Sequence, residues 1–137
     1  MKSAQTLVED AMARVSTLDL QQAQTLWGQE NVQFVDLREL GELQRDGIIS
    51  GAFHAPRGLL EFWFDSTSGT GKPALTRPGV RYVLFCAAGW RSALAALTLQ
   101  QMGVDQVCHI AGGFRGWKAA GAPCEVLDKT RTLKSVP

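Results

Sequence analysis

The chain has 137 residues, 45% hydrophobic and 20% charged, which is the length and composition of one globular domain. Its formal net charge of +1 gives no reason to expect nucleic acid or an anionic membrane as a partner, and no apolar run approaches the length of a bilayer span. These features exclude strongly basic nucleic-acid-binding proteins and integral membrane proteins.

The cysteines indicate a compartment. Cys86, Cys108 and Cys124 are an odd set without framework spacing, which favours a reducing environment. Glu9 and Asp10 lie inside the first apolar stretch and argue against a secretory signal. We therefore expect a cytoplasmic protein.

The N-terminal part predicts two helices. Leu7, Ala11 and Val15 share one face of an amphipathic helix over residues 4–15. We expect this helix to pack on its own domain, with a homodimer contact as the alternative. Residues 16–19 offer N-caps for a second helix from Leu20 to Trp27.

The next segments predict a strand and two polar stretches. Residues 33–37 have strand character, and Asp36 and Arg38 stand at the carboxyl end of this strand. A polar turn or short helix follows over residues 39–45, and another helix over residues 59–64. Residues 65–79 are rich in Ser, Thr, Gly and Pro and predict a long surface loop, which either shapes the approach to a site or is simply mobile.

The spacing of apolar residues changes at Cys86, from a strand pattern before it to a helical pattern after it. Residues 82–85 form a short apolar strand, and residues 94–102 carry a helical pattern that ends at Gly103. Cys86 therefore lies at the carboxyl end of a strand, where ligands of open α/β sheets tend to bind.

The residues after Cys86 suit an anion. Ala87, Ala88 and Gly89 have little or no side chain, so their N–H groups can converge on the sulfur at a helix N-terminus and favour the thiolate. Arg91 adds a planar fork of donors. We expect no metal site, since no second Cys or His lies at ligand spacing near Cys86. A buried structural cysteine is the alternative.

Beyond the central helix, residues 106–110 predict a strand. Cys108 and His109 should point to its opposite faces, so they are neither a metal pair nor a catalytic couple by themselves. Residues 111–117 predict a glycine turn, whose two adjacent glycines permit positive φ or close backbone approach, and a last short helix. Because strands alternate with helices, the fold class is α/β, with a central parallel sheet covered by helices on both faces.

Several segments together resemble the rhodanese family of sulfurtransferases. They are Cys86-Ala-Ala-Gly-Trp-Arg91-Ser92, Phe34–Glu39, Gly51–Gly58, Leu60–Trp63 and Gly112–Trp117, in the family's order. The resemblance implies a rhodanese-like domain over residues 17–124, between an N-terminal helical extension (1–16) and a C-terminal tail (125–137). The chain departs from the family at Ile48, where His is usual, and at Ser50, where Pro is usual. We expect His54 to be packed near a short strand.

The resemblance also implies roles for individual residues. Cys86 is the expected catalytic nucleophile, and Asp36 is expected to be structural near the site. The expected substrate-binding residues are Ala87, Ala88, Gly89, Trp90, Arg91, Ser92, Arg38 and Arg57. At least one of the aromatic residues Phe62, Trp63 and Phe64 is expected to wall the site.

The implied activity is transfer of a sulfane sulfur through a Cys86 persulfide, without a cofactor. The expected partners are a small-molecule donor such as thiosulfate and a thiol or cyanide acceptor, with a protein acceptor as a further option. Two alternatives stay open: a cysteine-dependent phosphatase or arsenate reductase of related fold, and a non-catalytic interaction module. Four residues separate Cys86 from Arg91, whereas the related phosphatases have five at this place.

Overall fold

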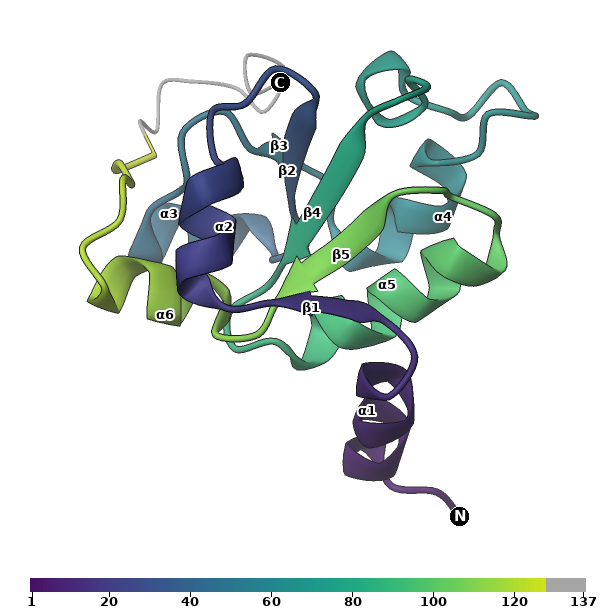
Figure 1. Cartoon of the computed structure of the whole chain (residues 1–137), viewed down its shortest axis with the longest axis horizontal. Helices are drawn as coiled ribbons and strands as arrows, with labels where there is room; N and C mark the ends of the chain where they lie inside the picture. Colours follow the sequence, from purple (N-terminus) through teal and green to yellow (C-terminus); the bar gives the residue numbers. More distant parts are fainter. Residues whose placement is uncertain (128–137) are drawn as a thin grey trace.

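A five-stranded, all-parallel sheet of order β1-β5-β4-β2-β3 forms the centre of the computed structural model, which describes residues 1–127 (Figure 1). The strands are β1 (Ser16–Leu18), β2 (Val32–Asp36), β3 (Phe53–His54), β4 (Arg81–Phe85) and β5 (Val107–Ile110). The predicted parallel α/β architecture is confirmed.

Over residues 1–127, six α-helices and two short 3₁₀ turns accompany the strands. The helices are α1 (Ala4–Met12), α2 (Leu20–Leu26), α3 (Leu40–Asp46), α4 (Leu60–Trp63), α5 (Trp90–Gln101) and α6 (Gly113–Ala119), and the turns are η1 (Arg57–Leu59) and η2 (Pro73–Leu75). Within residues 1–127, no helix has the length and apolar character needed to cross a membrane.

Both faces of the sheet are buried, as the apolar run of β4 predicts. Tyr82 and Leu84 point to the face that packs against α4 and α5, while Val83 and Phe85 point to the face that packs against α2 and α6. Successive strand residues alternate between faces, so one short strand contributes to two cores. Each fully buried apolar side chain of this kind stabilises the fold by roughly 1.5–3 kcal/mol.

Helix α1 packs on its own domain. Val8 and Ala11 lie against Ala93 of α5, and Ser3 caps the helix by accepting a hydrogen bond from the Thr6 N–H at 3.0 Å. This contact agrees with the intramolecular packing that we expected. The helix ends at Met12 rather than at residue 15 because the chain then turns into β1.

Strand β1 was missed by the sequence analysis, which assigned residues 16–19 to helix capping alone. Asp19 does cap α2, accepting from the Gln22 N–H at 2.8 Å, but Ser16–Leu18 pairs in parallel with β5. The division of the chain at residue 16 stays a prediction.

The loop over residues 65–79 lies away from Cys86. It leads into the amino end of β4 and lines a hollow together with residues that precede β5, whereas Cys86 follows the carboxyl end of β4. Of the two roles we considered, shaping the approach to Cys86 is therefore wrong. At the other end of the chain, Glu125 bridges to Ile48, and the rest of the predicted tail from residue 128 lies outside the described residues.

Candidate active site

Cys86 directly follows β4 and is almost fully buried, with 1% of its surface exposed. The chain then reverses through Ala87–Gly89 into α5. Gly89, the N-cap of α5, has φ +105°, and a Cβ there would lie 3.3 Å from the Ala111 carbonyl oxygen. Only glycine adopts this conformation readily, so Gly89 fixes the turn that wraps the loop around the sulfur.

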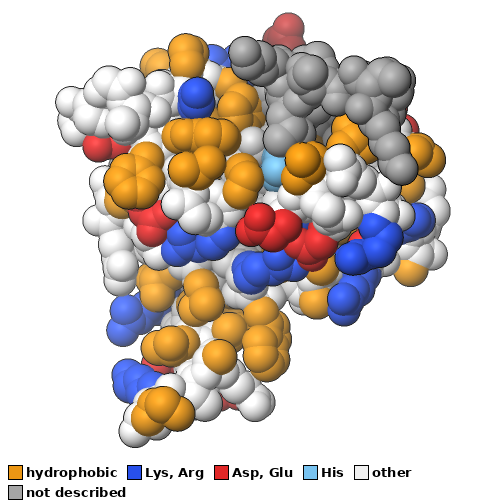
Figure 2. Space-filling model, turned by 180° about the vertical axis from the view of Figure 1, so that it is seen from behind, with side chains coloured by type: hydrophobic (Ala, Val, Ile, Leu, Met, Phe, Trp, Pro, Cys, Tyr) orange, Lys and Arg blue, Asp and Glu red, His pale blue; other side chains and the backbone are white. Residues whose placement is uncertain are grey.

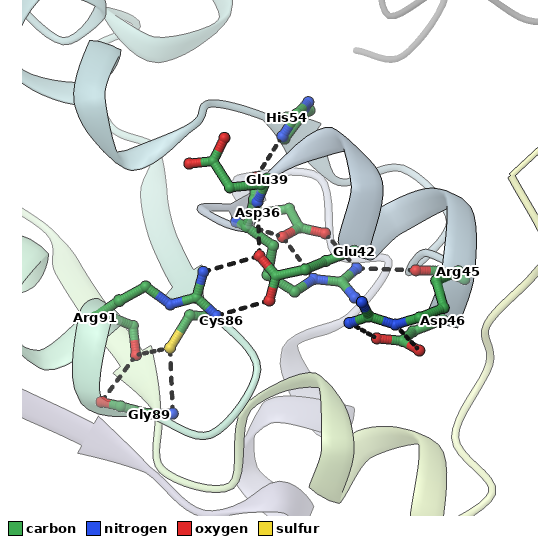
Figure 3. Close-up of polar contacts among 12 residues, drawn as sticks. Asp36, Glu39, Glu42, Arg45, Asp46, His54, Cys86, Gly89 and Arg91 are labelled. Carbon is green, nitrogen blue, oxygen red and sulfur yellow. Dashed lines mark hydrogen bonds and ion pairs between the residues drawn. The ribbon is translucent and has the colours of Figure 1, made fainter.

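Two polar groups contact the sulfur. The Gly89 N–H donates to Cys86 Sγ at 3.2 Å, and Ser92 Oγ lies 3.7 Å from the same atom (Figure 3). We expected the N–H groups of Ala87 and Ala88 to converge there as well. Within the described part of the chain, Gly89 is the one residue whose backbone N–H reaches Sγ, so fewer N–H groups bind the sulfur than predicted.

The first turn of α6 holds the Cys86 loop by two backbone hydrogen bonds. The Phe114 N–H donates to the Cys86 carbonyl at 2.7 Å, and the Arg115 N–H donates to the Ala87 carbonyl at 3.1 Å. Gly113 has φ +60°, and a Cβ there would come within 2.5 Å of the Ala87 oxygen. Of the two adjacent glycines, Gly113 thus shows both the positive φ and the close backbone approach that a glycine pair permits.

Arg91 is paired with a residue that the sequence analysis did not single out. Its Nη1 and Nη2 each donate to a Glu42 carboxylate oxygen at 2.9 Å (Figure 3). This bond holds the pKa of Glu42 down at about 2 and raises the pKa of Arg91. Both terminal nitrogens of Arg91 thus face Glu42, which favours a role in positioning the loop over direct binding of an anionic donor. Glu42 lies 49 residues away in sequence, so no local motif could reveal it.

Arg38 is a core residue. Its Nε and Nη2 donate to the Asp36 carboxylate at 3.0 and 2.8 Å, Nη2 also donates to the Gly47 carbonyl at 2.9 Å, and the guanidinium lies 4.1 Å from the Phe114 ring centroid. With 1% exposure, Arg38 has almost no surface to offer a substrate. These contacts favour the structural role for Arg38 and Asp36 together.

Arg57 and His54 contact other groups. Arg57 pairs with Glu61 at 2.8 Å and reaches Thr98 at 3.5 Å, and no contact joins it to Cys86 within residues 1–127. His54 ends β3 and its Nε2 lies 2.6 Å from the Arg38 carbonyl oxygen, so it is packed at a short strand as expected.

The three successive aromatic residues face different ways. Phe64 stacks edge-on against Tyr82, Trp63 packs against Phe53, and Phe62 is 58% exposed. None of these contacts places them against Cys86. Trp90, which begins α5 directly after the loop, is 54% exposed and is the aromatic side chain next to the site in sequence.

A cationic groove borders the loop. Arg45 of α3 and Arg115 and Lys118 of α6 line a groove of about 520 Å³ together with Ala87. Arg45 is partly neutralised by Asp46 at 2.9 Å. The residues of this groove come from two helices that only the fold brings together, so the sequence does not predict it. Charged side chains of both signs form a belt across the face in Figure 2.

His109 contacts the site from β5, opposite to Cys108. Its Nδ1 lies 2.9 Å from Ser92 Oγ, and its Nε2 lies 3.0 Å from Thr17 Oγ1 of β1. Burial lowers the pKa of His109 to about 4, so the imidazole is neutral near pH 7. The expected opposite orientation of the two side chains is confirmed, but we did not foresee that His109 would meet Ser92.

The other thiols differ from Cys86. Burial raises the pKa of Cys108 to about 11, and Cys124 is exposed. All three cysteines are free. Within residues 1–127, no group of three His, Cys, Asp or Glu side chains could hold a metal ion.

The family model for the rhodanese-like domain matches residues 19–120. The chain belongs to the rhodanese-like family. It is 31% identical to thiosulfate sulfurtransferase GlpE of Shewanella oneidensis over 111 residues, which are 81% of this chain and all of that protein.

Solved structures of rhodanese-like and related proteins share the fold. A protein of unknown function from Rhodopseudomonas palustris CGA009, named a possible tyrosine phosphatase, is 41% identical with a TM-score of 0.87, covering 91% of this chain and 96% of that one. The polysulfide-sulfur transferase homodimer of Wolinella succinogenes is 26% identical with a TM-score of 0.70, covering 91% of this rhodanese-like chain and 88% of that one.

Proposed function

We propose that this protein is a sulfurtransferase that moves a sulfane sulfur from a donor such as thiosulfate to a thiol or cyanide through a persulfide on Cys86. The observation that carries the proposal is the environment of Cys86 Sγ. The sulfur lies at the carboxyl end of β4, under a loop whose Gly89 N–H donates to it at 3.2 Å. The similarity to thiosulfate sulfurtransferase GlpE supports the same chemistry.

The reaction has two steps and needs no cofactor. The Cys86 thiolate attacks the outer sulfur of thiosulfate, a new S–S bond forms, and the donor's own S–S bond breaks as sulfite leaves with the electron pair. An acceptor thiolate or cyanide then attacks the outer sulfur of the persulfide, and the Cys86 thiolate returns. The Gly89 N–H stabilises negative charge on sulfur in both forms.

The cationic groove would recruit the donor. Thiosulfate is a dianion, and the exposed Arg115 lies in this groove beside Ala87 and next to Lys118 and Arg45. Positive potential at the mouth raises the local concentration of an anion before it reaches the buried sulfur. Arg91, held by Glu42, keeps a fixed positive charge near Cys86 without moving.

A phosphatase activity is the second candidate, because the Rhodopseudomonas palustris relative is named a possible tyrosine phosphatase. A phosphoryl group brings three equatorial oxygens that need donors around them. Here the loop spans only four residues between Cys86 and Arg91, and both terminal nitrogens of Arg91 face Glu42. This geometry favours a single sulfur atom over a phosphoryl group.

The two candidate activities are separated by measuring both on one preparation. We expect Cys86-dependent formation of thiocyanate from thiosulfate and cyanide, and no significant hydrolysis of aryl phosphates, with Cys86→Ser as the blank. Inserting one glycine between Gly89 and Trp90 should sharply reduce sulfur transfer. Efficient phosphate release that depends on Cys86 would reverse the assignment. Absence of both activities would favour a non-catalytic module.

The setting of the protein is part of the proposal. Three free cysteines suit a reducing compartment such as the cytoplasm. The acceptor is a small thiol or a protein thiol. A homodimer has a parallel in the Wolinella structure, and Leu7 and Met12 leave apolar surface exposed on α1, where Figure 2 shows hydrophobic side chains gathered on the projecting part.

A further inference from the structure

A line of polar atoms connects the buried sulfur to the edge of the sheet. Ser92 Oγ lies 3.7 Å from Cys86 Sγ and 2.9 Å from His109 Nδ1, and His109 Nε2 lies 3.0 Å from Thr17 Oγ1. Cys86, Ser92 and His109 are almost completely buried, whereas Thr17 is half-buried on β1, the edge strand. The line therefore leads from the sulfur to the outside of the protein.

The direction of donation along this line depends on the state of the sulfur. Each hydroxyl carries one proton, and a neutral imidazole carries one N–H. With a thiol, Cys86 donates to Ser92, Ser92 donates to Nδ1 at 2.9 Å in preference to the Gly89 carbonyl oxygen at 3.3 Å, and Nε2–H donates to Thr17. With a thiolate, Thr17 donates to Nε2, Nδ1–H donates to Ser92, and Ser92 donates to the sulfur. The two states require opposite tautomers of His109.

We propose that His109 is a positioning residue that relays the proton of Cys86 to Thr17 by changing its tautomer. As the S–H bond breaks, its proton passes to Ser92, the Ser92 proton to Nδ1, the Nε2 proton to Thr17, and the Thr17 proton to water. The products are the thiolate, now receiving a hydrogen bond from Ser92, and one proton in solvent. No group is oxidised or reduced.

The surroundings of His109 suit a relay that never becomes charged. The ring is fully buried, with 0% exposure, and the two side chains that hydrogen-bond to it, Ser92 and Thr17, are neutral. Burial opposes an imidazolium, so the proton moves on rather than staying on the ring. The charged groups near the sulfur are Arg91 with Glu42 and Asp36 with Arg38.

Thr17 is the residue at which to test the relay. The inference rests on Cys86 as the proposed nucleophile, and Thr17 touches neither the sulfur nor either ion pair. Thr17→Val keeps the β-branched shape and removes the hydroxyl that donates to Nε2 in the thiolate state. The hydroxyl bonds to Nε2 in both states, but in the thiolate state it begins a chain of donors that ends on an anion, and a bond in such a chain is the stronger one. We therefore expect the pH profile of Cys86 alkylation to move up, by no more than about one pH unit.

The high-pH plateau of the alkylation rate separates a relay from structural damage. In Thr17→Val the plateau should match wild type, because the thiolate itself is unchanged, and Thr17→Ser should restore the profile. The relay would be overturned if Thr17→Val lowered the plateau of the alkylation rate without moving the midpoint of its pH profile, or if it changed neither. These measurements use no sulfur donor, so failure of the wild type to form a persulfide would refute the proposed function and leave the relay standing.

The tautomer of His109 gives an independent readout. ¹⁵N NMR of the wild-type imidazole should show the proton on Nε2 when Cys86 is a thiol and on Nδ1 when it is a thiolate. A ring that keeps one tautomer throughout the titration of Cys86, or one that becomes doubly protonated as the thiolate forms, contradicts the proposal.

Discussion

Two arginines near Cys86 are each held by a carboxylate, but in different environments. Arg38 and Asp36 are 1% and 2% exposed, whereas the side chains of Arg91 and Glu42 are 39% and 20% exposed. A buried pair that loses one member leaves an uncompensated charge in the core, while an exposed pair is screened by water. Replacing each arginine should therefore have a different consequence, for stability in the case of Arg38 and for activity in the case of Arg91.

Replacing Arg38 should mainly unfold the protein. We expect Arg38→Ala to lower the free energy of unfolding by about 3 to 5 kcal/mol, because Asp36 stays buried without its partner. Urea unfolding measures this loss. Arg45→Ala is the matched control, since the Arg45–Asp46 pair is exposed, and it should change stability little. Equal stability of the two variants would contradict the structural role of Arg38.

Replacing Arg91 should mainly harm sulfur transfer. Arg91→Ala leaves the Glu42 carboxylate unpaired near the sulfur, where it repels both the thiolate and an anionic donor. We expect kcat/KM for thiosulfate to fall about tenfold, a modest loss because the pair is partly screened. Glu42→Gln in the Arg91→Ala background should recover part of it. No recovery in the double variant would show that Arg91 acts by touching the donor.

Helix α6 controls the loop through its first residues. Gly113 brings the α6 backbone against Cys86 and Ala87, so that two N–H groups can hold the loop carbonyls. The loop conformation thus depends on an element that starts 27 residues after Cys86 in the printed sequence.

Adding one methyl group to Gly113 should disturb this contact. Gly113→Ala forces a positive φ on alanine and a clash with Ala87, which we expect to cost about 1 to 3 kcal/mol or more in stability and to reduce sulfur transfer. Gly41→Ala is the control, because a Cβ there meets nothing within 4 Å and α3 gains a better helix former. Thermal unfolding and thiocyanate formation check both variants. Wild-type behaviour of Gly113→Ala would contradict the close approach.

The elements differ in how well the sequence predicts them. The change of period at Cys86 predicts β4 and α5 because both are long enough to show a pattern. Strand β1 has three residues, too few for a pattern, and its partner β5 lies about ninety residues away. The Glu42–Arg91 and Ser92–His109 contacts join residues 49 and 17 positions apart on different elements, so no local motif could predict them.

At the scale of the whole molecule, the elements that form the candidate site meet at the carboxyl edge of the sheet. The Cys86 loop, α3 and α6 all follow strand ends on this edge, while the loop over residues 65–79 lies at the opposite one (Figure 1). His109 is a titratable ring buried near this edge, and its burial makes the free energy of unfolding depend on pH.

Stability should fall on mild acidification because of His109. The unfolded chain takes up a proton near pH 6.5, but the folded ring does so only near pH 4, so stability is lost as pH falls between these values, by about 3 kcal/mol. Glu42 contributes over a lower pH range. Its folded-state pKa of about 2 stabilises the fold above pH 4.5, and this stabilisation is lost as the pH falls from 4.5 towards 2. Urea unfolding across pH 4–7 should show a slope that His109→Gln reduces. An unchanged slope would assign it to other groups.

The most direct test of sulfur transfer is the intact mass of the purified protein before and after thiosulfate. We predict a gain of one sulfur atom on Cys86, removed by cyanide, with Cys108 unmodified because its buried thiol has a raised pKa. Cys86→Ser should show no gain. A wild type that gains no sulfur, or a Cys86→Ser variant that gains it and still forms thiocyanate, would contradict the persulfide on Cys86.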